Sequence, residues 1–199
     1  MKFTELNLNE KILKGIEQAG FEECTAVQVL TLAETLKGRD VAVQSQTGTG
    51  KTAAFLITNY QLMCEEWTQV RKKALIIVPT RELAVQIEKE AALLGSHLDV
   101  TMGSIYGGVG YAAQEELLEK DADIIIGTPG RLLDFSRSGK LKLKERGILV
   151  IDEADRLFDM GFLPDLRRML RSMPPPDRRM TMLFSATLDA AARELAWEH

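Results

Sequence analysis

Residues 41–52 read V-A-V-Q-S-Q-T-G-T-G-K-T, and this stretch predicts more of the architecture than any other. The apolar run 41–43 predicts a short strand, which leads into a loop that holds Gly48 and Gly50. Glycines let a backbone approach a polyphosphate closely, and such a loop points its N–H groups and the positive end of the next helix at the anion. The stretch therefore predicts a phosphate cradle, the name used below for residues 45–52.

Two side chains complete the predicted cradle. Lys51 is placed to reach the outer phosphates of a nucleotide, and the Thr52 hydroxyl is placed to hold Mg²⁺. The general pattern G-x-x-x-x-G-K-[ST] has a glycine where this chain has Ser45, so the loop has to turn without it. A surface turn before an ordinary helix is the alternative, but the strand before the loop and the helix-compatible run 53–64 after it favour the cradle.

Composition describes an ordinary globular protein with no bulk charge that attracts a polyanion. The chain has 199 residues, 45% of them hydrophobic and 27% charged, with a net charge of −4. Any contact with nucleic acid must therefore be local. No apolar run approaches the roughly 18 residues of a membrane span, which predicts a cytoplasmic protein without a membrane partner. Cys24 and Cys64 are expected to be free thiols, and two histidines are too few for a histidine-rich metal centre.

Strands alternate with helices after residue 38. Apolar runs rich in β-branched residues predict strands at 41–43, 75–78, 100–105, 124–126, 148–151 and 182–184. Helical segments are predicted at 53–64, 82–94, 110–119, 131–136, around 163–170, and from about 189 onward. This alternation predicts an α/β fold with a central, mostly parallel sheet and helices on both faces.

Two more helices are predicted before the first strand. The first begins after Asn9 and ends at Gly20, and the second begins at Thr25 and ends at Gly38. The inward face of the second is predicted to consist of Val29, Leu30, Ala33 and Leu36. No linker, repeat or low-complexity segment interrupts the chain, so a single domain over residues 1–199 is expected.

Carboxylates follow the predicted strand 148–151. Ligands of open parallel sheets gather beyond the carboxyl ends of the strands. Asp152 could there accept Mg²⁺-bound waters opposite the cradle, and Glu153 could take a proton from an attacking water. The alternative is that D-E-A-D only caps the next helix with negative charge, which a helix dipole favours.

Other strand ends predict a track for a nucleic-acid backbone. Thr80 and Thr128 each stand where a helix should begin, Arg81 and Arg131 follow with positive charge, and a glycine pair at 107–108 permits close approach. Each feature alone is more often a helix cap or a turn. Together along one edge they predict a track that contacts phosphate and sugar rather than bases, and hence tolerates any sequence.

These motifs, in their order along the chain, resemble the first RecA-like domain of the DEAD-box RNA helicases nearly from end to end. The matching residues are Gly20-Phe21, Thr25, Gln28, S-Q-T-G-T-G-K-T, P-T-R-E-L-A, Gly107-Gly108, T-P-G-R, V-I-D-E-A-D and S-A-T. The resemblance implies a RecA-like P-loop NTPase domain that binds ATP and Mg²⁺, with residues 1–38 as an adenine-recognition segment. It also implies a second RecA-like domain, absent from these residues, that supplies arginines to the γ-phosphate.

The resemblance further implies roles for individual residues. ATP would be bound by Phe3 stacking on the adenine, by Gln28 on the adenine edge, and by Phe21, Thr25, Gln46, Thr47, Gly48, Thr49, Gly50, Lys51 and Thr52. Catalysis would rest on Lys51, Asp152 and Glu153, with Mg²⁺ held by Thr52 and, through water, by Asp152. Asp155, Ser185 and Thr187 would link the nucleotide state to RNA binding. RNA would be contacted by Pro79, Thr80, Arg81, Gly107, Gly108, Thr128 and Arg131.

The function expected from the resemblance is the ATP-binding lobe of an RNA helicase, which separates short duplexes when ATP closes two lobes and is nearly inactive alone. One alternative is a non-catalytic tether that binds nucleotide and RNA or protein. Another is an ATPase acting on DNA or metabolites, which Gln28 and S-A-T disfavour. Cys24 in place of the family's proline, M-P-P at 173–175 and R-E-L-A-x-E-H at 193–199 resemble the degradosome-associated bacterial subclass, which implies an RNA-degradation machinery as partner.

Overall fold

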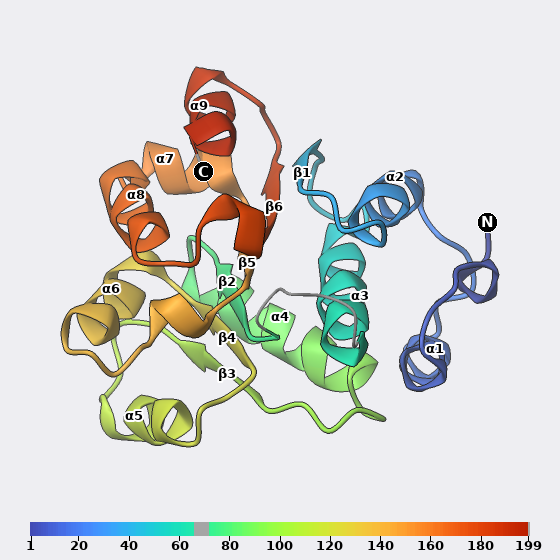
Figure 1. The fold of residues 1–199 in the computed structure, drawn as a ribbon, viewed down its shortest axis with the longest axis horizontal. Coiled ribbons are helices and arrows are strands. Elements are labelled where there is room, and N and C mark those ends of the chain that lie inside the picture. Colours follow the sequence, from blue (N-terminus) through green and yellow to red (C-terminus); the bar gives the residue numbers. More distant parts are fainter. Residues whose placement is uncertain (66–71, 199) are drawn as a thin grey trace.

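The computed structural model describes residues 1–65 and 72–198, so His199, the last residue of the R-E-L-A-x-E-H motif, lies outside it. Within these ranges, six strands form one sheet in the order β1-β6-β5-β2-β4-β3 (Figure 1). Every pairing between neighbouring strands is parallel. The strands are β1 (Val41–Gln44), β2 (Ala74–Ile77), β3 (Met102–Ile105), β4 (Ile124–Gly127), β5 (Ile148–Ile151) and β6 (Met180–Ser185).

Helices cover both faces of the sheet, as the alternation of elements predicted. One side carries α1 (Glu10–Gln18), α2 (Ala26–Thr35), α3 (Lys51–Cys64) and α4 (Arg81–Leu94). The other carries α5 (Ala112–Glu119), α6 (Pro129–Arg137), α7 (Ala154–Asp159), α8 (Leu163–Arg171) and α9 (Ala190–Glu198). Short 3₁₀ turns are η1 (Phe3–Glu5), η2 (Leu143–Glu145) and η3 (Pro176–Arg178). The separate helix α7 was not predicted.

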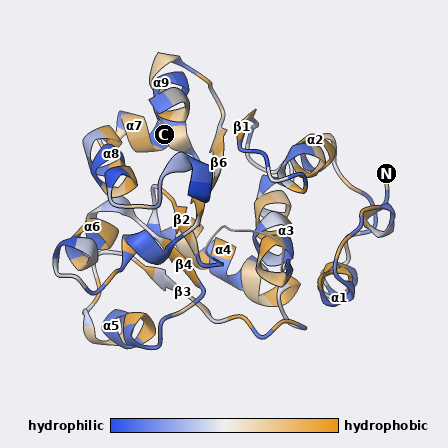
Figure 2. Cartoon of the chain, viewed as in Figure 1, coloured by the Kyte–Doolittle hydropathy of each residue, from blue (hydrophilic) through white to orange (hydrophobic). Residues whose placement is uncertain are grey.

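Two hydrophobic cores lie on the two faces of the sheet because successive strand residues point to opposite sides. In β2, Ala74 and Ile76 belong to the core under α3 and α4, whereas Leu75 and Ile77 belong to the core under α6 to α9. All four residues are fully buried. Figure 2 shows the same distribution, with hydrophobic colour on the central strands and polar colour on the outer surfaces of the helices.

The predicted inward face of α2 is wrong for Leu30 and Ala33, whereas Val29 is half-buried and Leu36 packs partly buried against the core. Leu30 is 70% exposed and Ala33 is also exposed, whereas the buried residues are Gln28, Thr31, Leu32 and Thr35. The reason is that α2 packs on α3, which presents polar side chains there: the Thr35 and Thr58 hydroxyl oxygens lie 2.7 Å apart. A buried polar group is stable against another polar group, so the polar face of α2 is the one that fits.

Parallel pairing brings all the strand carboxyl ends to one edge of the sheet, called the rim below. The register sets Gln44 of β1 beside Ser185 of β6, and Ile151 of β5 beside Ile77 of β2. The residues that follow these strands therefore gather in one place. Across residues 1–65 and 72–198, no helix combines the length and the apolar character needed to cross a membrane.

Candidate functional site

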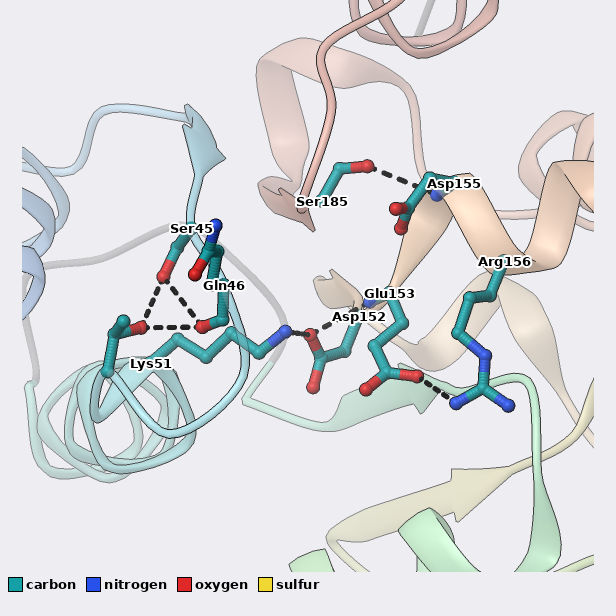
Figure 3. A network of polar contacts seen from close by, with 9 residues as sticks. Ser45, Gln46, Lys51, Asp152, Glu153, Asp155, Arg156 and Ser185 are labelled. Atoms are coloured by element: carbon teal, nitrogen blue, oxygen red, sulfur yellow. Dashed lines mark hydrogen bonds and ion pairs between the residues drawn. The ribbon is translucent and has the colours of Figure 1, made fainter.

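The phosphate cradle turns without its first glycine because hydroxyl groups hold it. Gly48 and Gly50 adopt left-handed φ angles of 79° and 88°, which glycine reaches without strain. Ser45 is buried, and its Oγ is hydrogen-bonded to the Thr49 hydroxyl, which also donates to the Gln46 carbonyl oxygen at 2.8 Å (Figure 3). Residues 46–48 are exposed, so the loop presents its backbone to solvent at the rim.

Lys51 and Asp152 meet across the rim. The Lys51 Nζ lies 2.9 Å from Asp152 Oδ1, and both side chains are buried (Figure 3). The same Oδ1 accepts a hydrogen bond from the backbone N–H of Glu153 at 2.8 Å. Burial raises the pKa of Asp152 above its usual value, while the Lys51 ammonium acts in the opposite direction. The β1-loop-helix unit and the end of β5 therefore meet at one place on the rim, as the sequence predicted.

The second carboxylate oxygen of Asp152 suits a metal ion. Oδ2 is buried and has no hydrogen-bond partner within the described part of the chain. Carboxylate oxygens are preferred ligands of Mg²⁺, which usually keeps several waters and takes few protein ligands beside substrate phosphates. The residues that the structure describes contain no group of three or more His, Cys, Asp or Glu side chains able to hold a metal by themselves.

Glu153 occupies a strained turn between β5 and α7. Its φ of 51° and ψ of 50° are left-handed, which for a residue other than glycine costs about 1–2 kcal/mol. Its Oε2 lies 2.7 Å from Nη1 of Arg156, and Figure 3 shows the two side chains directed at each other. Sequence reasoning missed Arg156, although the i, i+3 spacing on α7 could have indicated the ion pair.

Two of the residues predicted to recognise adenine, Gln28 and Thr25, contact the cradle. Gln28 is buried; its Nε2 donates to the Gly50 carbonyl oxygen at 3.0 Å and its Oε1 accepts from the Thr25 N–H at 2.8 Å. The Thr25 hydroxyl donates to the Thr49 carbonyl oxygen at 2.8 Å. A Cβ added to Gly50 would lie only 2.6 Å from Gln28 Nε2. The adenine segment and the phosphate loop thus form one unit, and contact with adenine stays a prediction.

Phe3 and Phe21 lie side by side near the amino terminus. Their ring centroids are 6.4 Å apart with an interplanar angle of 30°. Phe3 is only 2% exposed because it belongs to the hydrophobic core, whereas Phe21 is partly exposed. The Phe3 ring has no open face in this structure, so its stacking on adenine stays a prediction that requires the ring to be uncovered.

Ser185 connects the cradle to α7, the helix after Asp152 and Glu153, which are called the acidic turn below. Its carbonyl oxygen accepts from the N–H of Ser45 at 2.8 Å, and its hydroxyl oxygen accepts from the N–H of Asp155 at 3.1 Å. Ser185 is fully buried, whereas Thr187 is exposed. Two of the three predicted coupling residues are therefore in direct contact, and their role in coupling stays a prediction.

The predicted nucleic-acid residues occupy the rim on the β2-β4-β3 side. The Thr80 hydroxyl oxygen accepts from the Leu83 N–H at 3.3 Å and so caps α4. Arg81 is exposed, with its guanidinium carbon 5.0 Å from the ring centroid of Tyr106. Gly107 and Gly108 are exposed in the next loop. Pro79 is buried and Thr128 is half-buried at the start of α6.

Arg131 departs from this set. It is only 8% exposed, and its guanidinium carbon lies 3.9 Å from the ring centroid of Tyr111. Its Nη2 donates to the Val109 carbonyl oxygen at 3.0 Å, and its Nη1 donates to Gln114 Oε1 at 3.3 Å. The structure therefore directs this charge into the protein, where the predicted track would have it face outward.

Comparisons with known proteins agree with this geometry. Residues 25–195 match the family model described as DEAD/DEAH box helicase. The chain is 48% identical to the ATP-dependent RNA helicase RhlB of Idiomarina loihiensis, over 100% of this chain and 48% of the relative, and 46% identical to that of Pasteurella multocida, over 100% and 48%. It spans about half the length of these curated relatives.

Solved structures show the same fold. A DEAD box protein from the hyperthermophile Methanococcus jannaschii superposes with a TM-score of 0.90 at 37% identity, over 100% of this chain and 53% of that one. A hypothetical ATP-dependent RNA helicase from Sulfolobus tokodaii gives 0.86 at 37% identity, over 96% and 54%. The predicted α/β architecture, with a parallel sheet between two layers of helices, is confirmed.

Proposed function

Because the chain belongs to the DEAD/DEAH box helicase family, we propose that it is the ATP-binding lobe of an ATP-dependent RNA helicase. The observation that carries the proposal is the 2.9 Å contact between Lys51 and Asp152 beside the unpaired Asp152 Oδ2. An ammonium group and an unpaired carboxylate oxygen beside the predicted phosphate cradle support this proposal. Such a constellation serves a bound nucleoside triphosphate.

The residues of the cradle and the acidic turn have different roles in the proposed reaction. The loop's N–H groups and Lys51 bind and orient the phosphates. Thr52 and Asp152 would hold Mg²⁺, which supplies positive charge against the phosphate oxygens when bound. Glu153 would accept the proton of the attacking water, for which its carboxylate has to turn from Arg156 toward the nucleotide.

The other partners follow from the rim and from the length of the chain. Arg81 and the glycine pair would contact the RNA backbone without reading its sequence. A second RecA-like lobe would supply arginines to the γ-phosphate, a contribution worth about 10³–10⁵ in rate. We therefore expect this chain alone to hydrolyse ATP at near background. The complete protein would separate short RNA duplexes in the cytoplasm and would have an RNA-degradation machinery as its partner.

Titration of ATP–Mg²⁺ into the chain tests the nucleotide site. Lys51→Ala should abolish most of the affinity, because it removes the group that neutralises the phosphates. Glu153→Gln should retain the affinity, because its role is confined to the reaction. Lys120→Ala is the matched control, since Lys120 pairs with Glu116 on the exposed face of α5. Unchanged ATP affinity in Lys51→Ala would refute the assignment of the cradle.

Hydrolysis measurements test the rest of the proposal. Turnover by this chain should stay near background with and without RNA, so brisk RNA-stimulated turnover would contradict the need for a second lobe. In the complete protein, Glu153→Gln should stop duplex separation. An unchanged rate would instead favour a tether, and equal stimulation of ATPase activity by DNA and RNA would favour an enzyme without preference for RNA.

A further inference from the structure

The loop between β3 and α5, residues 106–111 and called the glycine loop below, is anchored from inside the protein. Residues 107–111 are all exposed, with Tyr111 at 47%. Three glycines in six residues give this loop large conformational freedom, and ordering such a backbone opposes binding. Two buried polar side chains reduce that freedom: Gln114 is 6% exposed and Arg131 is 8% exposed.

The two buried side chains hold the glycine loop at three points. Gln114 Nε2 donates to the Tyr106 carbonyl oxygen at 3.0 Å, at the start of the loop. Arg131 Nη2 donates to the Val109 carbonyl oxygen at 3.0 Å, in its middle. The Arg131 guanidinium lies against the ring of Tyr111, at the loop's end, and its Nη1 joins it to Gln114. The anchors are therefore one connected network.

This use of arginine depends on its shape more than on its charge. A guanidinium has five N–H donors in a rigid plane and a flat face that stacks on aromatic rings, whereas a lysine ammonium has neither. Within the described residues, Arg131 is part of no ion pair, and its neighbours are a carbonyl oxygen, an amide and aromatic rings. Arg81 on the same rim is exposed and makes the natural contrast.

We propose that Arg131 and Gln114 are positioning residues, which hold the glycine loop so that the N–H groups of Gly107 and Gly108 meet the RNA backbone, and that Arg131 is not itself a phosphate ligand. The proposal rests on RNA binding at the rim, as proposed above. Holding the loop in its bound shape before RNA arrives lowers the entropy lost on binding. A lysine at position 131 would keep the charge and lose the network.

The affinity of the chain for single-stranded oligouridylate at several salt concentrations tests this. Arg131→Lys and Arg131→Gln should both weaken binding by about tenfold, equivalent to about 1.4 kcal/mol. Arg131→Gln should leave the slope of log affinity against log salt near that of the wild type. Gln114→Leu should cause a similar loss. Combining Arg131→Gln with Gln114→Leu should cost less affinity than the sum of the two single losses, because both residues belong to one network. For comparison, Arg81 is exposed and proposed to contact phosphate directly, so Arg81→Gln should reduce the slope by about one.

Hydrogen exchange of the amides in residues 107–111, measured without RNA, gives a direct readout of the loop. Exchange should be faster in Arg131→Lys than in the wild type and unchanged in Lys120→Ala, whose ion pair with Glu116 lies on the exposed face of α5. ATP affinity reports that each variant is folded. Retained RNA affinity in Arg131→Lys, or a slope reduced by about one in Arg131→Gln, would make Arg131 a phosphate ligand and overturn the proposal. Wild-type protein that binds no RNA would refute RNA binding at the rim, while the exchange rates still decide whether Arg131 orders the loop.

Discussion

Asp152 and Asn59 both have unpaired polar side-chain atoms, but they lie in different parts of the molecule. Both are fully buried, and both have side-chain atoms without a hydrogen-bond partner in the part of the chain that the structure describes: Oδ2 of Asp152, and Nδ2 and Oδ1 of Asn59. Asp152 lies at the rim, beside Lys51 and the cradle. Asn59 lies in the middle of α3. We expect a cation held beside the cradle to pair with the unpaired oxygen of Asp152, whereas the unpaired atoms of Asn59 in the interior of a helix layer only lower stability.

The energetic consequence differs accordingly. Leaving a buried polar group unpaired costs about 1–3 kcal/mol. At Asp152 a bound cation can remove that penalty, so binding of the cation should stabilise the folded state by that additional amount. At Asn59 nothing in the described residues removes it, and the Thr31 hydroxyl on the facing helix α2 has the same deficit. The contrast distinguishes a site that awaits a ligand from a weak point in the packing.

The largest effect is expected from Asp152→Asn, which keeps the shape and removes the charge. The Mg²⁺-dependent part of ATP affinity should fall by about a hundredfold, the equivalent of about 2.7 kcal/mol and within the range for hydrogen bonds to charged groups. Calorimetric titration of ATP with and without Mg²⁺ measures it. Asp121→Asn is the matched control, because Asp121 pairs with Lys73 at the opposite edge of the sheet and is exposed. A Mg²⁺ effect that survives in Asp152→Asn would place the metal elsewhere.

A smaller effect of the opposite kind is expected at Asn59. Asn59→Leu removes two unpaired polar atoms and should raise the free energy of unfolding by about 1–2 kcal/mol. Its neighbour supplies the control: the Thr58 hydroxyl donates to the Ala54 carbonyl oxygen at 3.0 Å, so Thr58→Val should lower stability by about 1 kcal/mol. Urea denaturation measures both. A loss of stability in Asn59→Leu would show that the amide has a partner and would erase the contrast with Asp152.

The two regions also differ in how well the sequence predicts them. The cradle and the acidic turn could be predicted, because glycines, a lysine and a carboxylate just after an apolar strand have few other uses at a rim where parallel strands end. The packing of α2 could not, because the polar residue that it meets, Thr58, lies on another helix. Leu30 favoured the wrong face, since a helical pattern read alone cannot show what its partner presents. The burial of Arg131 was unpredictable for the same reason, because its contacts come from α5 and the glycine loop.

The smallest predicted effect separates the two residues by pH, because Asp152 titrates and Asn59 does not. Burial raises the pKa of Asp152 in the folded chain, whereas the unfolded chain ionises near the usual value of about 3.9. Between these two pKa values the folded state binds more protons than the unfolded state. The free energy of unfolding therefore falls as pH rises through this window, by at most about 1.4 kcal/mol per pH unit, and levels off above the folded pKa. Asp152→Asn lacks this contribution.

Denaturation of the wild type and Asp152→Asn from pH 4 to pH 8 measures the effect as a difference, in which the titrating groups that do not act on Asp152 cancel. The wild type should lose stability relative to Asp152→Asn as pH rises, while the difference between Asn59→Leu and the wild type should stay constant. The charged groups that act on Asp152 are Lys51 and Glu153, and of these Lys51 opposes the predicted direction. If the free energy of unfolding of the wild type instead rises relative to that of Asp152→Asn with rising pH, the Lys51 ammonium outweighs burial. Lys51 and Asp152 would then form a stabilising ion pair before any nucleotide binds.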